Sequence, residues 1–307
     1  MSPFFSIVIP TKNRLALLKD CVESILNQVF QDFEVIIVDD QSEDGTMAWV
    51  QSLKSHKIKT IRNEWFGDSG GRNTGIKHAV GRYITLIDDD DLVLETYLSD
   101  FYDYLKSFNF PSDTALRTNF WYLKDGVKFK KSESYDKDLM NPIDFILDRF
   151  CSSCVICFPS KLIKEVKFPV GITQWQDTHF LLRFFINCKL VQLNNTNYLY
   201  RIHSQMGSRL VMNKNYFKKN ALEHAGFIQS FYEEFSHLSS YFNKNKFERL
   251  ISKKLMEYAA NAMGKKYNNV AFQLLFASLK KKILFQDKKL YLVFVRNFFL
   301  DKRSSYN

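Results

Sequence analysis

The sequence predicts an α/β protein whose mixed, mostly parallel sheet is flanked by helices and followed by a helical C-terminal extension. Two observations support this fold class. Short β-branched apolar runs alternate with segments of helical periodicity over the first part of the chain, which is typical of a parallel sheet. From about residue 213 onward the apolar residues recur at helical spacings. The 307 residues, 46% hydrophobic and 25% charged, suffice for one large domain with an appendage.

Four apolar runs in the first 95 residues predict buried parallel strands. The first run is stopped by Pro10, and the fourth ends in four aspartates. The expected strands are 4–9, 33–38, 58–61 and 83–87. Helices with apolar residues three and four positions apart are expected at 15–29, through 50–53 and at 70–80. Asn13 precedes the first of these helices and is expected to cap its first turn.

Beyond residue 94 the alternation loosens. The expected elements are a helix to 108, a strand at 115–121, a loop or exposed hairpin at 124–138, a strand at 154–158, a helix at 178–187 and strands at 190–193 and 198–202. Three helices follow, at 217–235, 247–262 and 272–283. The changes in periodicity and charge place a boundary near residue 210.

The charge of the chain is divided unevenly. Residues 1–213 contain 25 Lys and Arg against 26 Asp and Glu, whereas residues 214–307 contain 18 against 7, so the net charge of +10 comes from the C-terminal part. A basic segment of this kind predicts contact with membrane headgroups or nucleic acid, unless it is only a solvated helical face. Lysines at 280–282 and 288–289 beside the apolar run 290–300 favour a headgroup interface over packing against the rest of the chain or a second subunit.

The cysteines and apolar runs indicate the compartment. Five cysteines, an odd number, without a signal-peptide core argue against a disulfide-built secreted protein, so we expect a reducing, cytoplasmic location. No run reaches the roughly 18 apolar residues that a membrane span needs. Cys151, Cys154 and Cys157 are spaced like metal ligands, but a fourth ligand is missing nearby, and buried free thiols are expected instead.

Polar residues follow the predicted strands at the edge where parallel sheets bind ligands. After the strands come Pro10 and Thr11, then Asp39 and Asp40, then the aspartates at 88–91. Four successive carboxylates repel each other unless some are neutralised, and a divalent cation is the commonest neutraliser. Oxygen ligands select Mg²⁺ or Mn²⁺, which often bind phosphates as well, so the pattern predicts a nucleotide diphosphate ligand. Helix caps and exposed turns are the alternative for such a run.

Five motifs in register resemble those of family 2 glycosyltransferases. They are SIVIPTKNR at 6–14, SILNQVFQDFE at 24–34, IVDDQS at 37–42 followed by DGT at 44–46, GRNTGI at 71–76, and GRYITLIDDDD at 81–91. The resemblance implies a GT-A fold, a nucleotide-sugar donor that is usually a UDP-sugar, a DXD motif that binds Mn²⁺ or Mg²⁺, and inversion at the anomeric carbon. It also implies a catalytic domain at 1–210, with a nucleotide-sugar-binding half at 1–110 and an acceptor half at 111–210, followed by a basic helical region at 211–307.

The resemblance further implies roles for individual residues at the donor site. Asp40 matches the acidic residue that contacts the nucleotide base, and Asp90 matches the carboxylate that reaches the metal. The residues expected to bind the donor are Pro10, Thr11, Arg14, Asp40, Gly71, Arg72, Asp88 and Asp89. A turn and a surface ion pair are the alternative use of Gly71 and Arg72. Two positions depart from the family pattern: Lys12 stands where an aromatic residue is frequent, and Gln41 where Gly or Asn is usual.

Inversion needs a base on the acceptor side, and Asp177 is the candidate. The segment TQWQDTHFLLR at 173–183 resembles the family's acidic residue at a helix start, with Gln176 in place of a frequent Glu. A helix N-terminus lowers a carboxylate pKa, so we expect Asp177 to be ionised at neutral pH; an ordinary N-cap is the alternative. His203, in the closing segment YRIHSQMGS at 200–208, is expected near the metal or the diphosphate, unless it is a structural or surface histidine.

Other functions fit the sequence less well. A sugar-phosphate nucleotidyltransferase would need a glycine-rich loop after the first strand, and residues 10–14 contain no glycine. A phosphatase of the haloacid dehalogenase type would need Asp-x-Asp-Gly-Thr, but Ser42 lies two residues before Asp44. A nucleic-acid-binding protein would leave the aspartates at the strand ends unexplained, so no nucleic-acid partner is expected.

The resemblance also suggests where such an enzyme works. The expected setting is bacterial surface-glycan assembly, such as capsule or O-antigen synthesis. The acceptor would be a saccharide or a lipid-linked oligosaccharide. The protein would lie in the cytoplasm, peripheral on the inner face of the cytoplasmic membrane, with its basic helices near an anionic membrane surface.

Overall fold

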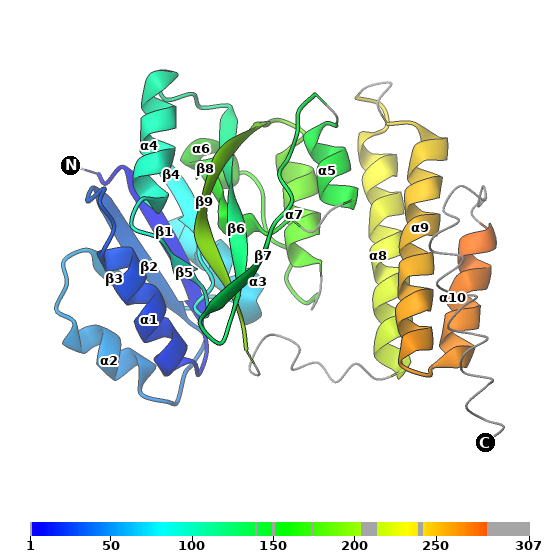
Figure 1. Ribbon diagram of the computed structural model, residues 1–307, viewed down its shortest axis with the longest axis horizontal. Helices are drawn as coiled ribbons and strands as arrows, with labels where there is room; N and C mark the ends of the chain where they lie inside the picture. Colours follow the sequence, from blue (N-terminus) through cyan, green and yellow to red (C-terminus); the bar gives the residue numbers. More distant parts are fainter. Residues whose placement is uncertain are drawn as a thin grey trace. The chain divides into compact units, whose positions relative to one another are not determined.

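The computed structural model shows two compact units in the chain, residues 1–206 and 207–307. The first is an α/β unit and the second is helical (Figure 1). The structure describes residues 2–138, 140–148, 151–172, 175–203, 214–238 and 242–280. None of the helices within these ranges combines the length and the hydropathy that crossing a lipid bilayer requires.

One sheet forms the centre of the first unit and confirms the predicted fold class. Its strands are β1 (Phe5–Thr11), β2 (Phe33–Asp39), β3 (Ile58–Arg62), β4 (Tyr83–Leu86), β5 (Leu92–Val93), β6 (Thr114–Lys124), β7 (Val127–Lys131), β8 (Ile156–Pro159) and β9 (Lys189–Ile202). In the described residues the order is β3-β2-β1-β4-β8-β6-β9-β5, with β7 beside β6. The first four strands in this order are parallel, β8 runs antiparallel to both of its neighbours, and β6 and β9 are again parallel.

Helices flank this sheet on the chain segments between its strands (Figure 1). They are α1 (Leu15–Leu26), α2 (Thr46–Ser52), α3 (Gly67–His78), α4 (Tyr97–Ser107), α5 (Pro142–Asp148), a 3₁₀ turn η1 (Ser153–Val155), α6 (Ser160–Ile163) and α7 (Gln176–Phe184). Every residue of β1 and β2 is buried. Because successive strand residues point to opposite faces, both faces of these two strands must be covered, as a continuous apolar run predicts.

The start of α1 differs from the expectation, because Asn13 does not cap the helix. Asn13 has φ 52° and its side-chain oxygen accepts a hydrogen bond from the Glu43 backbone N–H at 2.7 Å. The helical N–H of Leu15 instead donates to Asp44 at 2.8 Å. A side chain from the loop after β2 therefore replaces the predicted local cap, and it fixes the loops after β1 and β2 to each other.

The predicted strands at 190–193 and 198–202 are one continuous strand, β9. The polar residues between them look like a turn in the sequence, but Asn197 is buried and paired. Its side chain accepts a hydrogen bond from the Thr118 hydroxyl at 2.8 Å and donates to Asp100 at 2.7 Å. Irregular register against β6 near Asn119 accommodates the extra residues. The strand thus extends without a break to residue 202, beside the aspartates.

The second unit contains three helices in its described residues, α8 (Lys214–Phe235), α9 (Lys244–Gly264) and α10 (Asn268–Lys280). The apolar positions predicted for α9 are buried: Phe247, Ile251, Leu255, Tyr258 and Ala262. α9 packs against both other helices. The lysines at 281–282 and 288–289 and the apolar run 290–300 lie outside the described residues.

Helix α3 lies close to β1 because the two residues of α3 that face this strand, Gly71 and Gly75, have no side chain. A Cβ atom added at Gly75 would lie 2.2 Å from Val8 Cγ1, and one at Gly71 would lie 2.7 Å from Pro10 Cβ. Glycine is therefore needed at both positions for this packing distance. The close approach places Arg72, on the same helix, at the edge of the sheet where the aspartates lie.

Gly75→Ala is expected to destabilise the first unit by roughly 1–3 kcal/mol, because the added methyl group overlaps Val8 and forces α3 away from β1. The matched change Gly226→Ala, at an exposed position in α8 with open space around it, is expected to stabilise its unit by roughly 0.5–1 kcal/mol. Urea unfolding followed by circular dichroism measures both. An unfolding midpoint for Gly75→Ala at or above that of the wild type would contradict the packing argument.

Candidate functional site

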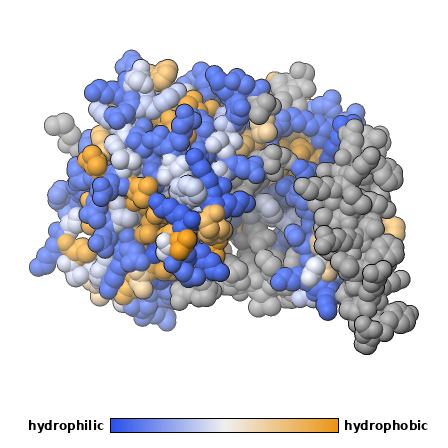
Figure 2. Space-filling view, viewed as in Figure 1, coloured by the Kyte–Doolittle hydropathy of each residue, from blue (hydrophilic) through white to orange (hydrophobic). Residues whose placement is uncertain are grey.

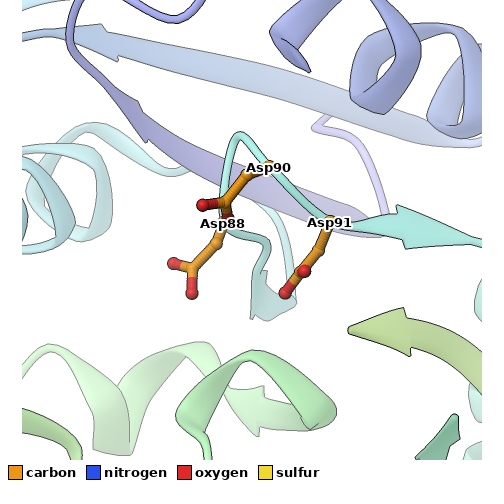
Figure 3. A group of neighbouring side chains, drawn as sticks. All are labelled: Asp88, Asp90 and Asp91. Atoms are coloured by element: carbon orange, nitrogen blue, oxygen red, sulfur yellow. The ribbon is translucent and has the colours of Figure 1, made fainter. Parts of the chain in front are cut away.

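The loop between β4 and β5 carries the four aspartates at the C-terminal edge of the sheet. Figure 3 shows the side chains of Asp88, Asp90 and Asp91 leaving this loop. One carboxylate oxygen from each of the three lies within 4.8 Å of the others. β2 and β3 lie on one side of β1 and β4 lies on the other, so the loop after β4 emerges where the strand order reverses. This is the part of an α/β sheet where ligands bind.

Thr11, at the end of β1, and Arg14, just before α1, bind two of the aspartates. Arg14 Nη1 donates to Asp89 Oδ1 at 2.7 Å and to Asp90 Oδ2 at 2.8 Å. The Thr11 hydroxyl donates to Asp89 Oδ2 at 2.7 Å. His203 Nε2, beyond the end of β9, lies 3.2 Å from Asp90 Oδ2. Three predicted residues from distant parts of the chain, Thr11, Arg14 and His203, therefore meet at Asp89 and Asp90.

Asp91 is bound entirely within the protein. Its Oδ2 accepts a hydrogen bond from the Tyr198 hydroxyl at 2.6 Å, and its Oδ1 accepts one from the Arg201 backbone N–H at 2.8 Å. The Arg201 guanidinium also donates to the Asp90 carbonyl and to Asp20. Asp91 is fully buried, so these bonds attach the loop to β9.

Burial and mutual repulsion raise the pKa values of this cluster. The pKa of Asp89 rises to about 6, chiefly because the carboxyl is buried, although the charge of Arg14 opposes the rise. The pKa values of Asp90 and Asp91 are also raised, first by burial and then by the neighbouring carboxylates. A cation that binds here would compete with protons as well as with Arg14.

The donor set fits a hard divalent cation. Carboxylate oxygens are the ligands that Mg²⁺ and Mn²⁺ prefer, and His203 adds an imidazole nitrogen beside Asp90. Within the described chain, Asp88 and Asp90 each keep one carboxylate oxygen without a hydrogen bond, whereas both oxygens of Asp91 are used. Asp88 and Asp90 are therefore better placed to bind a cation than Asp91.

Asp40, the residue predicted to contact a nucleotide base, lies at the end of β2 and is already well bonded. Its Oδ1 accepts from the Asn63 amide at 3.0 Å, and its Oδ2 accepts from the Gly67 backbone N–H at 3.2 Å. Lys12 forms an ion pair with it at 3.3 Å. These contacts fix the first turn of α3 against β2, and Asn63 and Gly67 were not singled out from the sequence.

Arg72 connects the aspartate loop to α7. Its Nη2 donates to Asp88 at 2.6 Å, and the guanidinium lies over the Phe168 ring, with 5.5 Å between its carbon and the ring centroid. Burial raises the pKa of Asp177, the predicted base, and the charge of Arg72 opposes part of that rise. Its Nε is buried without a hydrogen-bond partner in the described chain. A single cation thus stabilises a carboxylate on each side of the site.

Asp177 lies in the first turn of α7, after Trp175, which holds the N-cap position with φ 62°. The carboxylate accepts a hydrogen bond from the buried Ser153 hydroxyl at 2.6 Å. The expectation that the helix N-terminus lowers the pKa of Asp177 is wrong. Burial raises this pKa, and the charge of Arg72 and the Ser153 hydrogen bond offset only part of the rise. A carboxylate with a raised pKa is a stronger proton acceptor.

The cysteines offer no thiolate to this site, although the Cys21 thiol donates to the Asp88 backbone carbonyl at 3.5 Å. All five are free and buried, as expected for the group at 151–157. Burial raises the pKa of the Cys154 and Cys157 thiols well above the usual range, so both stay protonated at neutral pH. Neither the thiol chemistry nor the spacing provides a metal site here.

Mn²⁺ is expected to raise the melting temperature more at pH 7.5 than at pH 5. The folded-state pKa values of Asp89, Asp90 and Asp91 exceed the unfolded value of about 3.9, so the folded state binds the extra protons, and the metal-free protein loses stability as pH rises from about 4 through 6. A cation replaces those protons, and at 100 times its Kd it stabilises by about 2.7 kcal/mol.

Thermal unfolding with EDTA and with MnCl₂, at matched ionic strength, measures this difference. Addition of KCl at the same ionic strength is the control for screening. Equal melting shifts at both pH values would show that the cation does not bind at the aspartates.

Residues 6–156 match the family described as Glycosyl transferase family 2. The chain is 31% identical over 225 residues to Glycosyltransferase GlyG of Streptococcus pneumoniae, an alignment that covers 66% of this chain and 72% of GlyG. It is 41% identical over 101 residues to the GalNAc(5)-diNAcBac-PP-undecaprenol beta-1,3-glucosyltransferase of Campylobacter jejuni, covering 32% of this chain and 33% of that protein.

Further relatives extend this similarity. The Poly(ribitol-phosphate) beta-glucosyltransferase of Bacillus spizizenii is 29% identical over 199 residues, which is 62% of this chain and 30% of that protein. S. aureus TarS in complex with UDP-GlcNAc has a similar fold, with a TM-score of 0.60 at 18% identity over 91% of this chain and 89% of that one. The mannosyltransferase PcManGT from Pyrobaculum calidifontis, in complex with GDP-Man and Mn²⁺, gives a TM-score of 0.54 at 15% identity over 100% and 87% of the two chains.

Proposed function

Because the chain belongs to glycosyl transferase family 2, we propose that it transfers a sugar from a UDP-sugar to a hydroxyl group of a saccharide acceptor, with inversion at the anomeric carbon and with the help of Mn²⁺ or Mg²⁺. The observation that carries this proposal is that Arg72 bonds Asp88 of the aspartate cluster and also Gln176, the residue before Asp177. The aspartates can hold a nucleoside diphosphate through a cation, and Asp177 can accept a proton.

The donor would bind at the aspartate loop. Asp88 and Asp90, with His203, would hold the cation, which offsets the negative charge of the leaving diphosphate when it is bound. Arg14 and Arg72 are the cations in position to bind phosphate oxygens. The structures of similar fold that contain UDP-GlcNAc and GDP-Man with Mn²⁺ support a nucleotide-sugar donor.

The remaining donor residues would shape the nucleotide site. Thr11 orients Asp89 through its hydroxyl, and Pro10 packs against Gly71, so the backbone at the start of α3 stays close to β1. Asp40 would receive the base at the end of β2, where contacts with Asn63, Gly67 and Lys12 hold its carboxylate in place. This arrangement resembles the cradle that the sequence motifs imply.

Asp177 would act as the general base. In the transfer step the acceptor oxygen forms a bond to the anomeric carbon while the bond from that carbon to the diphosphate oxygen breaks, and the hydroxyl proton moves to the Asp177 carboxylate. The nucleoside diphosphate leaves with the electron pair of the broken bond. The Ser153 hydroxyl donates to the carboxylate at 2.6 Å and orients it. The raised pKa of Asp177 favours proton acceptance near neutral pH.

The acceptor would be a bacterial surface glycan or its lipid-linked precursor. Two relatives act, by their names, on an undecaprenol diphosphate-linked saccharide and on poly(ribitol phosphate), and both of these acceptors contain phosphate. A peripheral position on the cytoplasmic membrane, through the basic second unit, would bring the enzyme to a lipid-linked acceptor.

Asp90→Asn is expected to abolish turnover and Mn²⁺-dependent UDP binding while the fold is retained, because it removes a charged ligand from the cation. Release of nucleoside diphosphate from a panel of UDP- and GDP-sugars with Mn²⁺ measures turnover, and calorimetry measures UDP binding. Asp113→Asn, at an exposed ion pair with Lys189, is the matched control for charge and should leave both unchanged. Wild-type Mn²⁺ dependence in Asp90→Asn would remove this residue from the metal site.

Asp177→Asn is expected to lower sugar transfer by on the order of 10²-fold or more, because the amide cannot accept the hydroxyl proton. UDP and Mn²⁺ affinities should stay at wild-type values, since Asp177 lies on the acceptor side of Arg72. Calorimetry with UDP and Mn²⁺ distinguishes a role of Asp177 in proton transfer from a role in donor binding. A matching loss of UDP affinity would place Asp177 in the donor site instead.

A further inference from the structure

The hairpin formed by β6 and β7 projects from the sheet beside the candidate site and has no role in the proposed donor chemistry. All five residues of β7 are exposed, and Val127 and Phe129 expose 64% and 54% of their surface. The end of β6 pairs with the end of β9, where Lys124 lies opposite Ile202, one residue before His203. Figure 1 shows β7 alongside β6 at this end of the sheet.

A row of aromatic rings leads from the aspartates to this hairpin. It begins at Tyr198, which is bonded to Asp91, and continues through Phe120 and Tyr200 on neighbouring strands. The ring centroids of Phe120 and Tyr200 are 5.8 Å apart, and those of Tyr200 and Tyr122 are 5.5 Å apart.

The outer end of the row is exposed to solvent. The centroids of Tyr122 and Phe129 are 5.9 Å apart, and Lys130 Nζ lies 5.7 Å from the Tyr122 ring centroid. Burial, and then the charges of Asp91, Asp88 and Asp90, raise the pKa of Tyr200. Core packing explains the buried inner rings, but it does not explain an exposed phenylalanine at the end of the same row.

The hairpin is also basic. Lys128, Lys130 and Lys131 are exposed, and none of them forms an ion pair within the described part of the chain, although Asp125 and Glu133 flank the group. Residues 1–213 are nearly neutral as a whole, so this is a local concentration of positive charge. Over the region of β7, Figure 2 shows hydrophobic side chains directly beside strongly hydrophilic ones.

We propose that the β6–β7 hairpin binds the acceptor as a phosphate-bearing saccharide or polyol chain, with the carbon face of a residue on Tyr122 and Phe129 and one phosphate near Lys130 on the same face. Lys128 and Lys131 pair with Leu123 and Trp121 and therefore lie on the other face of β7, where they would bind further phosphates of a chain that passes around this exposed strand. Flat aromatic rings offer apolar area to a sugar face, and unpaired ammonium groups attract phosphate. This inference rests on the proposed function. It favours an acceptor over a membrane surface because the aromatic row is continuous with the aspartate cluster.

Binding of a fluorescently labelled ribitol phosphate octamer to the full chain tests the proposal. The triple change Lys128→Gln, Lys130→Gln and Lys131→Gln is expected to weaken binding by roughly tenfold and to flatten its salt dependence. Phe129→Ala is expected to weaken it by roughly threefold to tenfold. An uncharged maltooctaose of similar length should bind the wild type much more weakly than the phosphate chain does.

Matched controls separate the hairpin from general effects. Changing the exposed Lys54, Lys106 and Lys161 to Gln removes the same charge elsewhere, and Phe108→Ala removes another exposed phenylalanine. Both controls should leave octamer affinity within about twofold of the wild type. Equal losses in control and hairpin variants, or an octamer that does not bind the wild type, would overturn the proposal.

Two further measurements distinguish failure of the hairpin proposal from failure of the proposed function. If the hairpin variants lose sedimentation with anionic vesicles but keep octamer affinity, the hairpin binds membrane and the proposal is wrong. UDP binding with Mn²⁺, measured on the same variants, should match the wild type. Absence of that binding in the wild type would contradict the proposed function while leaving the octamer result to decide the role of the hairpin.

Discussion

Repulsion among four successive aspartates is the constraint on which the arrangement of the first unit depends. Carboxylates at 88–91 cannot share one buried loop unless opposite charges and hydrogen-bond donors reach them. The partners come from different elements: Arg14 precedes α1, Arg72 lies in α3, and Arg201 lies in β9. Arg14 pairs with Asp89 and Asp90, Arg72 pairs with Asp88, and the backbone N–H of Arg201 binds Asp91, so these elements must all meet at the end of β4.

This requirement explains features that seem unrelated in the sequence. Glycine at position 75 lets α3 lie close enough to β1 for Arg72 to reach Asp88. The unbroken course of β9 brings Tyr198 and the backbone of Arg201 to Asp91, more than 100 residues away in the chain. The loops after β1 and β2 are tied together by Asp44, which keeps Arg14 in place. Packing and charge compensation therefore select the same geometry.

Local sequence signals predicted most of the fold but fewer of the contacts. Apolar runs and helical spacings gave strands and helices close to those observed, because the burial of β1 and β2 on both faces requires continuous apolar sequence. The polar residues within β9 concealed its continuity, since their partners Thr118 and Asp100 lie on other elements. The same limit applies to the cap of α1, because Asp44 is 29 residues away from the N–H that it binds.

At the candidate site, the sequence motifs identified the charged residues but not the residues that form hydrogen bonds with them. Asp177 could be found by its place before an apolar helix, whereas Ser153, which binds it, is one serine among many and lies 24 residues earlier. The direction of the pKa shift of Asp177 was also beyond the sequence, because it depends on burial that only the packed structure defines. Asp91 was adjacent to the motif, yet its structural role becomes visible only with β9 beside it.

Arg14 gives the metal-free protein an internal counter-ion. Because its guanidinium already bridges Asp89 and Asp90, the chain can reach its folded arrangement without a divalent cation in the loop. Under the proposed function, binding of a cation at Asp88 and Asp90 would exchange one positive charge for another. The fraction of the protein with a cation at this loop would then depend on the concentrations of free metal and of nucleotide. The chain could fold before either is present.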